Sequence, residues 1–494
     1  MLFTTATFAL LFLPLVLAGY YALGRVSHWG AALWLFLSSV FFYGYWMPEF
    51  TLLLLGSIVT NFLFAQRIAA SATRAASSRA WLVAGVAFNL GMLAYFKYAN
   101  FFVDNLTALL GIDWHFGRVI LPIGISFYAF TQIAYLADTW SGKVNEGRAV
   151  HYGLFVTYFP HLIAGPVLHH AQMMPQFADP AVYRYDGARF WGGLSIFALG
   201  LVKKVVLADG MAPYADAVFA PVDAGASPSQ MEAWLAAFAY TFQLYFDFSG
   251  YSDMAIGLSW MFNIRLPFNF DSPYKSVNIS EFWRRWHISL STFLRDYLYV
   301  PLGGNRRGPW RRYANLLTTM ILGGFWHGAS WSFVLWGGLH GAYLVVNHGF
   351  VALTHKLGWS SRLSSSKSFA VFGWAATFLS VVLAWVMFRA QTIAGATRMC
   401  QALVGLSSQP AEGDLLLWNA GLQSTTGWAW CLVLGGVSVL MPNSNRIGSL
   451  TLNSLRGSPG LQSFVGGAAL AAALGLILLN TARDSVSAFI YFNF

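Results

Sequence analysis

The stretch from Asn278 to Gly328 reads NISEFWRRWHISLSTFLRDYLYVPLGGNRRGPWRRYANLLTTMILGGFWHG and differs from the apolar chain around it. It holds a histidine near each end, His287 and His327. It also holds seven arginines: Arg284, Arg285, Arg295, Arg306, Arg307, Arg311 and Arg312. Only 10% of the chain is charged. Such a cluster is costly in apolar surroundings unless it reaches water or serves a site, so we expect the functional site here.

The composition indicates a polytopic, all-helical membrane protein. The 494 residues are 57% hydrophobic and 17% aromatic, with a mean hydropathy of +0.55. Soluble domains are usually about 45–50% apolar and about 25% charged. The net charge of +10 indicates topology and anionic ligands more than nucleic acid. The two cysteines, Cys400 and Cys431, give no disulfide framework and no metal-like spacing.

Apolar runs long enough to cross about 30 Å of hydrocarbon predict about twelve transmembrane helices. The first, Phe8 to Leu23, lacks a preceding basic region, so we interpret it as an uncleaved helix. We expect the other spans near 30–46, 50–66, 80–97, 119–138, 188–208, 234–262, 314–331, 333–352, 369–389, 425–441 and 462–480.

The basic linkers predict the orientation of these spans. Arg67, Arg74 and Arg79 follow the third span, whereas Glu49 and Asp104 lie in the opposite linkers. The positive-inside rule then places the basic stretch in the cytoplasm and both termini outside it. Between 138 and 188, YGLFVTYFPHLIAGPVLHH is interrupted by prolines and predicts a re-entrant or interfacial segment.

The two histidines are the candidate chemical groups. A neutral imidazole takes a proton from a hydroxyl near pH 7, which suits acyl transfer to an alcohol. His327 lies in GGFWHGAS, in an apolar helix expected to begin near Asn315; a histidine merely bonded to a neighbouring helix is the alternative. His287 shares helical spacing with Trp283 and Trp286, which also fits an interfacial helix that binds lipid headgroups.

The remaining motifs predict no metal site and no tightly bound cofactor. His161, His169 and His170 follow the proline-broken segment, and His340 lies one span after His327. None has a carboxylate or cysteine at metal-ligand spacing. The chain contains neither a G-x-S-x-G motif nor a glycine-rich phosphate loop followed by lysine.

The block FWRRWHISLS, followed 40 residues later by WHGAS, resembles the membrane-bound O-acyltransferase (MBOAT) superfamily. LPIGISFYAFTQIAYLAD, TYFPHLIAGPVLHH, YFDFSGYSDMAIG and RLPFNFDSPYKSVNISEFWRR resemble its bacterial branch, which includes the acetylases of alginate and bacterial cellulose. The resemblance implies tilted helices around a central tunnel, with His327 as the essential base. It gives His287, nearer the cytoplasmic mouth, a supporting role in orienting the donor.

The resemblance also implies a donor and partners. Acetyl-coenzyme A would be the acyl donor, and Arg284, Arg285, Arg306 and Arg307 would attract its phosphates from the cytoplasm. The acetyl group would reach an exported polysaccharide through a periplasmic partner of the SGNH-hydrolase type. D-alanyl transfer from a carrier protein and a transporter without chemistry are the alternatives. For the arginines, positive-inside topology with lipid contact is an equal alternative.

The C-terminus adds a last hypothesis. We expect an acyltransferase core over 1–441 and an extra helix with an aromatic tail over 442–494, ending in FIYFNF. The tail resembles the single-span partner peptide of the teichoic D-alanylation system. Tyr491 would then be a first acyl acceptor, holding an acetyl ester until the periplasmic partner collects it. A simple aromatic anchor in the membrane interface is the alternative.

Overall fold

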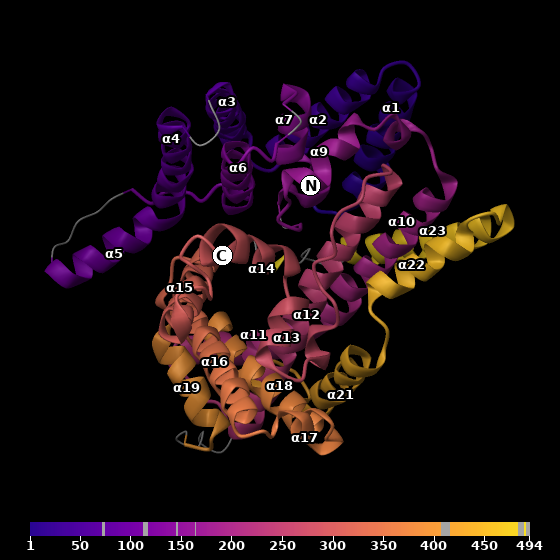
Figure 1. Cartoon of the computed structure of the whole chain (residues 1–494). Helices are drawn as coiled ribbons and strands as arrows, with labels where there is room; N and C mark the ends of the chain where they lie inside the picture. The colour runs from indigo at the N-terminus through magenta and orange to yellow at the C-terminus, as the bar shows by residue number, and fades with distance from the viewer. Residues whose placement is uncertain are drawn as a thin grey trace. The chain divides into compact units, whose positions relative to one another are not determined.

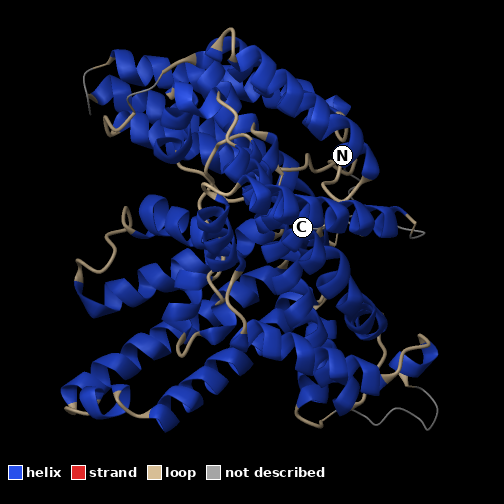
Figure 2. Ribbon diagram, turned by 90° about the vertical axis from the view of Figure 1, so that its right-hand side faces the viewer, coloured by secondary structure: helices blue, strands red, loops and turns tan. Residues whose placement is uncertain are grey.

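A computed structural model gives the fold, which is helical throughout the part of the chain that it describes, with no strand there (Figure 2). The described residues are 1–71, 75–111, 117–144, 147–163, 165–406, 415–482 and 489–490. The chain divides into two compact units, each built from separated segments. The all-helical prediction is confirmed.

The first unit comprises residues 1–202, 250–268 and 444–493. Its helices begin at recognisable signals: Ser27 and Asp186 cap α2 and α10 through their side-chain oxygens, and prolines open α3 and α23. The main helices are α1 (Leu13–Gly24), α2 (His28–Gly44), α3 (Pro48–Ala70), α4 (Ala76–Leu93), α5 (Ala99–Leu110), α6 (Ile125–Trp140), α7 (Ala149–Thr157), α9 (His170–Ala178), α10 (Gly187–Leu201), α22 (Ser444–Leu455) and α23 (Pro459–Thr481).

Helices of the first unit pack closely through small residues. Helices α3, α4 and α6 contact one another, and α23 packs along α10 (Figure 1). A Cβ on Gly193 of α10 would lie only 2.5 Å from the backbone oxygen of Gly257. Such glycine contacts let membrane helices approach closely. The segment expected to be irregular forms the short helices α7, α8 (Phe159–Leu162) and α9, buried in this unit.

The second unit comprises residues 203–249 and 269–443. The long helix α12 (Gln230–Met261) begins in it and ends in the first unit. The other helices are α11 (Asp209–Asp223), α13 (Ile279–Arg285), α14 (Ile288–Leu294), α15 (Gly308–His327), α16 (Trp331–Lys356), α17 (Ser360–Ser364), α18 (Lys367–Arg389), α19 (Ile393–Leu403), α20 (Leu416–Asn419) and α21 (Ser424–Leu440). The core of this unit is aromatic, with Trp286, Trp336 and Trp385 almost fully buried.

The described residues contain six helices long and apolar enough to cross a membrane, or seven if the bent pair α21 and α22 counts as one span. The six are Thr7–Gly24, Pro48–Ala70, Ala76–Leu110, Gly187–Asp223, Lys367–Arg389 and Pro459–Thr481. The expected count of about twelve is not confirmed. Some expected spans form helices that are too short, since α2 and α21 have 17 residues and α6 has 16. At about 1.5 Å per residue, helices of this length are shorter than the hydrocarbon core of about 30 Å.

The boundary predicted from the sequence, between residues 441 and 442, lies close to the point where the chain passes from the second unit to the first. The segment after it joins the first unit through the contact of α23 with α10. The division into an acyltransferase core and an extra helix remains a prediction.

Candidate active site

His327 is the last residue of α15, in the second unit. The helix begins at Gly308, not near Asn315 as expected, because Pro309 provides a good first-turn residue ahead of the apolar run. His327 therefore ends the helix instead of lying inside it. The residue is 4% exposed, and its ring centroid lies 5.0 Å from that of Trp326, 5.1 Å from Trp336 and 5.2 Å from Phe388. The partial negative charge at a helix C-terminus favours a cation, the form that this imidazole takes on accepting a proton.

His287 lies at the junction of α13 and α14, in the left-handed backbone conformation with φ 43° and ψ 55°. Few residues other than glycine adopt this conformation, and it often marks functional sites. The expected continuous amphipathic helix is therefore wrong here, because the helix ends at Arg285 and restarts at Ile288. Trp286 is also only 2% exposed, so it belongs to the protein core and not to a membrane-interface anchor.

Asn269 determines which nitrogen of His287 carries the proton. The backbone N–H and the hydroxyl of Ser289 both donate to Asn269 Oδ1, at 3.2 and 2.8 Å. That atom is therefore an acceptor, and His287 Nδ1, 3.2 Å away, must donate to it. The lone pair of the neutral ring is then on Nε2. Burial lowers the pKa of His287 to about 3, so the ring is neutral near pH 7.

Trp326 connects the two histidines. Its ring centroid lies 6.4 Å from that of His287 and 5.0 Å from that of His327. Residues 40 positions apart in the sequence thus belong to one buried aromatic cluster of the second unit. An imidazole in such apolar surroundings is suited to accept a proton from a hydroxyl and to return it to a leaving group.

The four predicted donor-binding arginines have different surroundings. Arg285 donates to Glu281 at 2.7 Å and to the backbone oxygen of Asp271 at 3.2 Å, so its guanidinium is partly engaged. Arg284, Arg306 and Arg307 are exposed and form no ion pair within the described part of the chain. Arg306 and Arg307 lie in the turn before α15, and three glycines with positive φ, Gly303, Gly304 and Gly308, shape this turn.

Tyr491 lies outside the described residues, so its position is not part of the described structure. Its neighbour Phe489 is 1% exposed, and its ring stacks on Tyr251 of α12 at 4.6 Å. Phe3 stacks on the same tyrosine at 4.9 Å. Phe489, the first residue of the aromatic tail, is thus buried within the first unit and not displayed on its surface.

The histidines of the proline-broken segment have structural partners in the first unit. His161 Nε2 lies 2.9 Å from the backbone oxygen of Phe155. His170 Nδ1 lies 3.2 Å from Asp138 Oδ2, a pairing that sequence spacing did not reveal. Within the described ranges no group of three or more metal-binding side chains comes together.

Two further features were not apparent from the sequence. Lys204 Nζ, which is buried, lies 2.8 Å from Asp209 Oδ1 and 2.7 Å from Asp247 Oδ1. Sequence spacing does not reveal this cluster, because Asp247 lies on α12, far along the chain from Lys204. This buried ionic cluster joins α12 to the helix preceding α11, and removing the lysine would leave two buried carboxylates without their cation.

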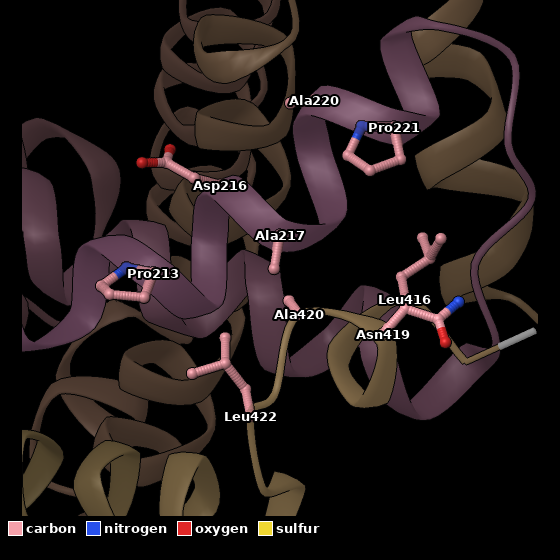
Figure 3. Close-up of a pocket in the computed structure, with 9 residues that line it drawn as sticks. All are labelled: Pro213, Asp216, Ala217, Ala220, Pro221, Leu416, Asn419, Ala420 and Leu422. Atoms are coloured by element: carbon pink, nitrogen blue, oxygen red, sulfur yellow. The ribbon is translucent and has the colours of Figure 1, made fainter.

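A cavity of about 640 Å³ lies between α11 and α20 (Figure 3). One wall carries the carboxylate of Asp216, which accepts from Arg389 at 2.7 Å. None of the predicted site residues lines it. The lining residues are Pro213, Asp216, Ala217, Ala220, Pro221, Leu416, Asn419, Ala420 and Leu422.

Comparison with known proteins identifies the class of this site. The model of the membrane-bound O-acyltransferase family matches residues 148–388, which include His287 and His327. A peptidoglycan O-acetyltransferase of Helicobacter pylori is 37% identical over 535 aligned positions, covering 100% of this chain and 98% of that protein. The chain belongs to the membrane-bound O-acyltransferase family. It is therefore an O-acyltransferase, and a transporter without chemistry is set aside.

Other MBOAT relatives show how the family branches. A probable alginate O-acetylase AlgI of Pseudomonas putida is 44% identical over 408 residues, covering 82% of this chain and 80% of that protein. A teichoic acid D-alanyltransferase of Streptococcus thermophilus is 26% identical over 289 residues, covering 54% of this chain and 68% of that protein. The resemblance to the bacterial branch of the MBOAT family is confirmed.

Proposed function

We propose that this chain is a membrane O-acetyltransferase that takes acetyl groups from cytoplasmic acetyl-coenzyme A for a polysaccharide outside the cytoplasmic membrane. The observation that carries the proposal is the pair of buried imidazoles, His287 and His327, which both contact the ring of Trp326. The similarity to acetylases along most or all of the chain favours acetyl over D-alanyl as the transferred group.

In this proposal His327 acts as the general base. The hydroxyl oxygen of the acceptor bonds to the carbonyl carbon of the thioester while the His327 imidazole takes the hydroxyl proton. The tetrahedral intermediate then breaks its carbon–sulfur bond, and the imidazolium returns the proton to the sulfur. The products are an acetyl ester and a free thiol, so atoms and charge balance. Neutral His287, whose Nδ1 is held by Asn269, orients the donor.

The exposed arginines Arg284, Arg306 and Arg307 would bind the phosphates of coenzyme A at the cytoplasmic side. Phosphates pair well with guanidinium groups. The glycine-rich turn that presents Arg306 and Arg307 leaves both side chains without a competing carboxylate among the described residues. Coenzyme A would thus be a substrate that comes and goes, not a resident cofactor.

Tyr491 would be the first acceptor in this scheme. Its acetyl ester would pass to a periplasmic partner of the SGNH-hydrolase type, so that the polymer need not enter the membrane. Burial of Phe489 against Tyr251 supports a tail that folds back onto the protein, whereas a plain interfacial anchor needs no such contact. The scheme requires a bacterial inner-membrane location with both termini in the periplasm.

Two acceptor polymers fit the comparisons. The alginate O-acetylases, which match 82% of this chain, support an exported polysaccharide similar to alginate or cellulose as one acceptor. Peptidoglycan is favoured by the H. pylori relative, because that match extends over the whole chain, including the tail. Ester-linked acetate measured in purified peptidoglycan and in exopolysaccharide from a deletion strain distinguishes the two.

Replacement of His327 tests the proposed chemistry. Purified protein in proteoliposomes should release thiol from acetyl-coenzyme A, and His327→Ala should lower this rate by about 10²–10⁴-fold, the usual loss for a general base. His327→Gln should behave in the same way. Elution volume and melting temperature check that both variants fold. A folded variant that keeps more than about a tenth of the wild-type rate contradicts the assignment.

A further inference from the structure

Three arginines of the first unit converge: Arg189 in α10, Arg265 after α12 and Arg456 after α22. Arg189 Nη1 donates to the backbone oxygen of Asn263 at 3.3 Å, which brings its guanidinium to the segment that carries Arg265. The charges of Arg265 and Arg456 both act on Arg189. Arg265 and Arg456 are exposed, whereas Arg189 is partly buried. Segments far apart in the sequence thus bring their positive charges to one place.

Close contacts between helices explain why these residues meet. A Cβ on Gly192 of α10 would lie 3.9 Å from the Cα of Leu452 in α22. A Cβ on Gly187, at the start of α10, would lie 2.9 Å from Gln462 Oε1 in α23. The arginine of α10 lies between these two glycines in the sequence, and the arginine of the α22–α23 link lies between the two residues that they face.

The cluster carries more positive than negative charge. Asp186 Oδ2 lies 3.6 Å from Arg189 Nε, and Asp186 Oδ1 accepts from the Arg189 backbone N–H as the cap of α10. Within the described ranges, Arg265 and Arg456 form no ion pair. Three guanidinium groups thus share one carboxylate, and like charges held close together repel one another. A bound anion would remove this repulsion.

The cluster lies at the level expected for lipid headgroups. Two candidate membrane spans begin here, one at Gly187 and the other at Pro459. Arg189 is the third residue of the first span, and Arg456 precedes the second span by three residues. Tyr185 is 57% exposed and is a residue type enriched at membrane interfaces. The positive-inside rule that orients the basic stretch places this end of both spans in the cytoplasm.

The chemistry of the cluster matches one class of ligand. Guanidinium groups bind phosphate oxygens through paired hydrogen bonds. Anionic phospholipids present a phosphodiester at this depth of the cytoplasmic leaflet, where clustered basic residues attract them. A phospholipid also has acyl chains, and the start of α23 is apolar and open, with Leu461 37% and Phe464 75% exposed. A free phosphate has no group that would contact these side chains.

We propose that Arg189, Arg265 and Arg456 form a binding site for the phosphate of an anionic phospholipid in the cytoplasmic leaflet. The lipid connects α10 and the end of α12 to the α22–α23 pair, and so holds the C-terminal helices to the rest of the first unit. The site is independent of the proposed acetyl transfer, because none of the three arginines belongs to the chemical step or to the donor surface proposed above.

Lipid retention tests the site directly. The wild-type protein, incubated in detergent with equal amounts of phosphatidylglycerol and phosphatidylcholine, should retain phosphatidylglycerol about 10-fold or more in preference by native mass spectrometry, as one or two charge-assisted hydrogen bonds provide. Arg265→Gln combined with Arg456→Gln should lower this preference to about 2-fold or less. Arg25→Gln combined with Arg67→Gln is the matched control. It removes the same charge from exposed arginines of the first unit and should keep the preference.

Melting temperatures in lipid nanodiscs provide the second readout. The wild-type and control proteins should melt at a higher temperature in phosphatidylglycerol than in phosphatidylcholine, because a ligand of the folded state stabilises it. The Arg265/Arg456 double variant should lose this difference. Equal retention of the two lipids by the wild-type protein, or an unchanged preference in the double variant, overturns the inference.

The same nanodiscs distinguish a lipid from a soluble anion. Inorganic phosphate or coenzyme A, added to the wild-type protein in phosphatidylcholine, should leave the melting temperature unchanged. Stabilisation by either compound that disappears in the double variant, without a preference for phosphatidylglycerol, assigns the arginines to a soluble phosphate and overturns the lipid site. Thiol release from acetyl-coenzyme A is not used as a readout, so either result leaves the proposed function to its own test.

Discussion

At the scale of single residues, the site depends on one amide oxygen. Asn269 Oδ1 accepts from the Ser289 backbone and hydroxyl and from His287 Nδ1. It fixes both the tautomer of the imidazole and the strained backbone at φ 43°. Without this acceptor, three buried donors would lose their partner, at about 1–3 kcal/mol each.

We expect His287→Ala to weaken activity less than His327→Ala, mainly by raising KM for the donor. Asn269→Leu should have the same effect as His287→Ala, whereas Asn269→Asp keeps a hydrogen-bond acceptor and should retain more activity. Because burial lowers the pKa of His287 to about 3, its ring does not titrate between pH 5 and 8. His287→Asn should therefore leave the pH dependence of kcat unchanged in that range. Complete loss of activity in folded His287→Ala, equal to that of His327→Ala, would mean that the two roles are wrongly assigned.

At the scale of elements, α15 and α16 position His327, Trp336 and His340. Figure 1 shows the two helices side by side. A Cβ on Gly324 would lie 2.2 Å from the backbone oxygen of Phe333, and one on Gly337 would lie 2.3 Å from that of Met320. The helices can be this close only because both positions lack a side chain. Their separation sets where the imidazole of His327 lies, one turn after Gly324.

We expect Gly324→Ala to push the helices apart and to reduce activity at least about 10-fold. Overpacking usually costs about 1–3 kcal/mol, so the melting temperature should also fall. Gly338→Ala is the matched control, since a Cβ at Gly338 meets nothing within 4 Å. Equal activity of the two variants would show that the close crossing does not position the site.

At the scale of the whole molecule, the positive charge that the topology places on one side of the membrane should attract the negatively charged donor. Arg306→Gln combined with Arg307→Gln should raise KM for acetyl-coenzyme A and make it less sensitive to salt, because screened attraction between charges is lost. Arg295→Gln is the control from the same segment, since Arg295 already pairs with Asp296 at 2.7 Å. A change in membrane insertion alone, with KM unaltered, would make the arginines topological.

The tail gives the second prediction at this scale. Tyr491→Phe keeps an aromatic anchor and removes only the hydroxyl, so it should abolish acetyl transfer to the partner. Intact-mass analysis of the wild-type protein after incubation with acetyl-coenzyme A should show one labile acetyl group on the C-terminal peptide. Full activity of Tyr491→Phe would falsify the relay. Phe489→Leu provides a comparison that disturbs the packing on Tyr251 but keeps the hydroxyl.

The sequence by itself determined the class of the protein. The apolar composition indicates a membrane protein. Many helices, and the Pro and Gly residues that interrupt them, can also be recognised from the sequence, because these signals depend on neighbouring residues only. The blocks around His287 and His327 identified the family for the same reason, because each is a short contiguous motif. Among the described residues, six expected spans correspond to helices that are long and apolar enough to cross a membrane.

Only the tertiary structure decided what surrounds the reactive groups. Asn269 reaches His287 across 18 residues, and Trp283 reaches His340 from another helix. The break at His287 depends on such contacts, because no glycine or proline in FWRRWHISLS ends the helix there. The end of α15 at His327 has a local signal as well, since Gly328 follows it. Tertiary contacts also decided the burial of Trp286. A tryptophan suits a membrane interface as well as a protein core, and here the side chain lies in the core because it packs against Phe282 and Trp385.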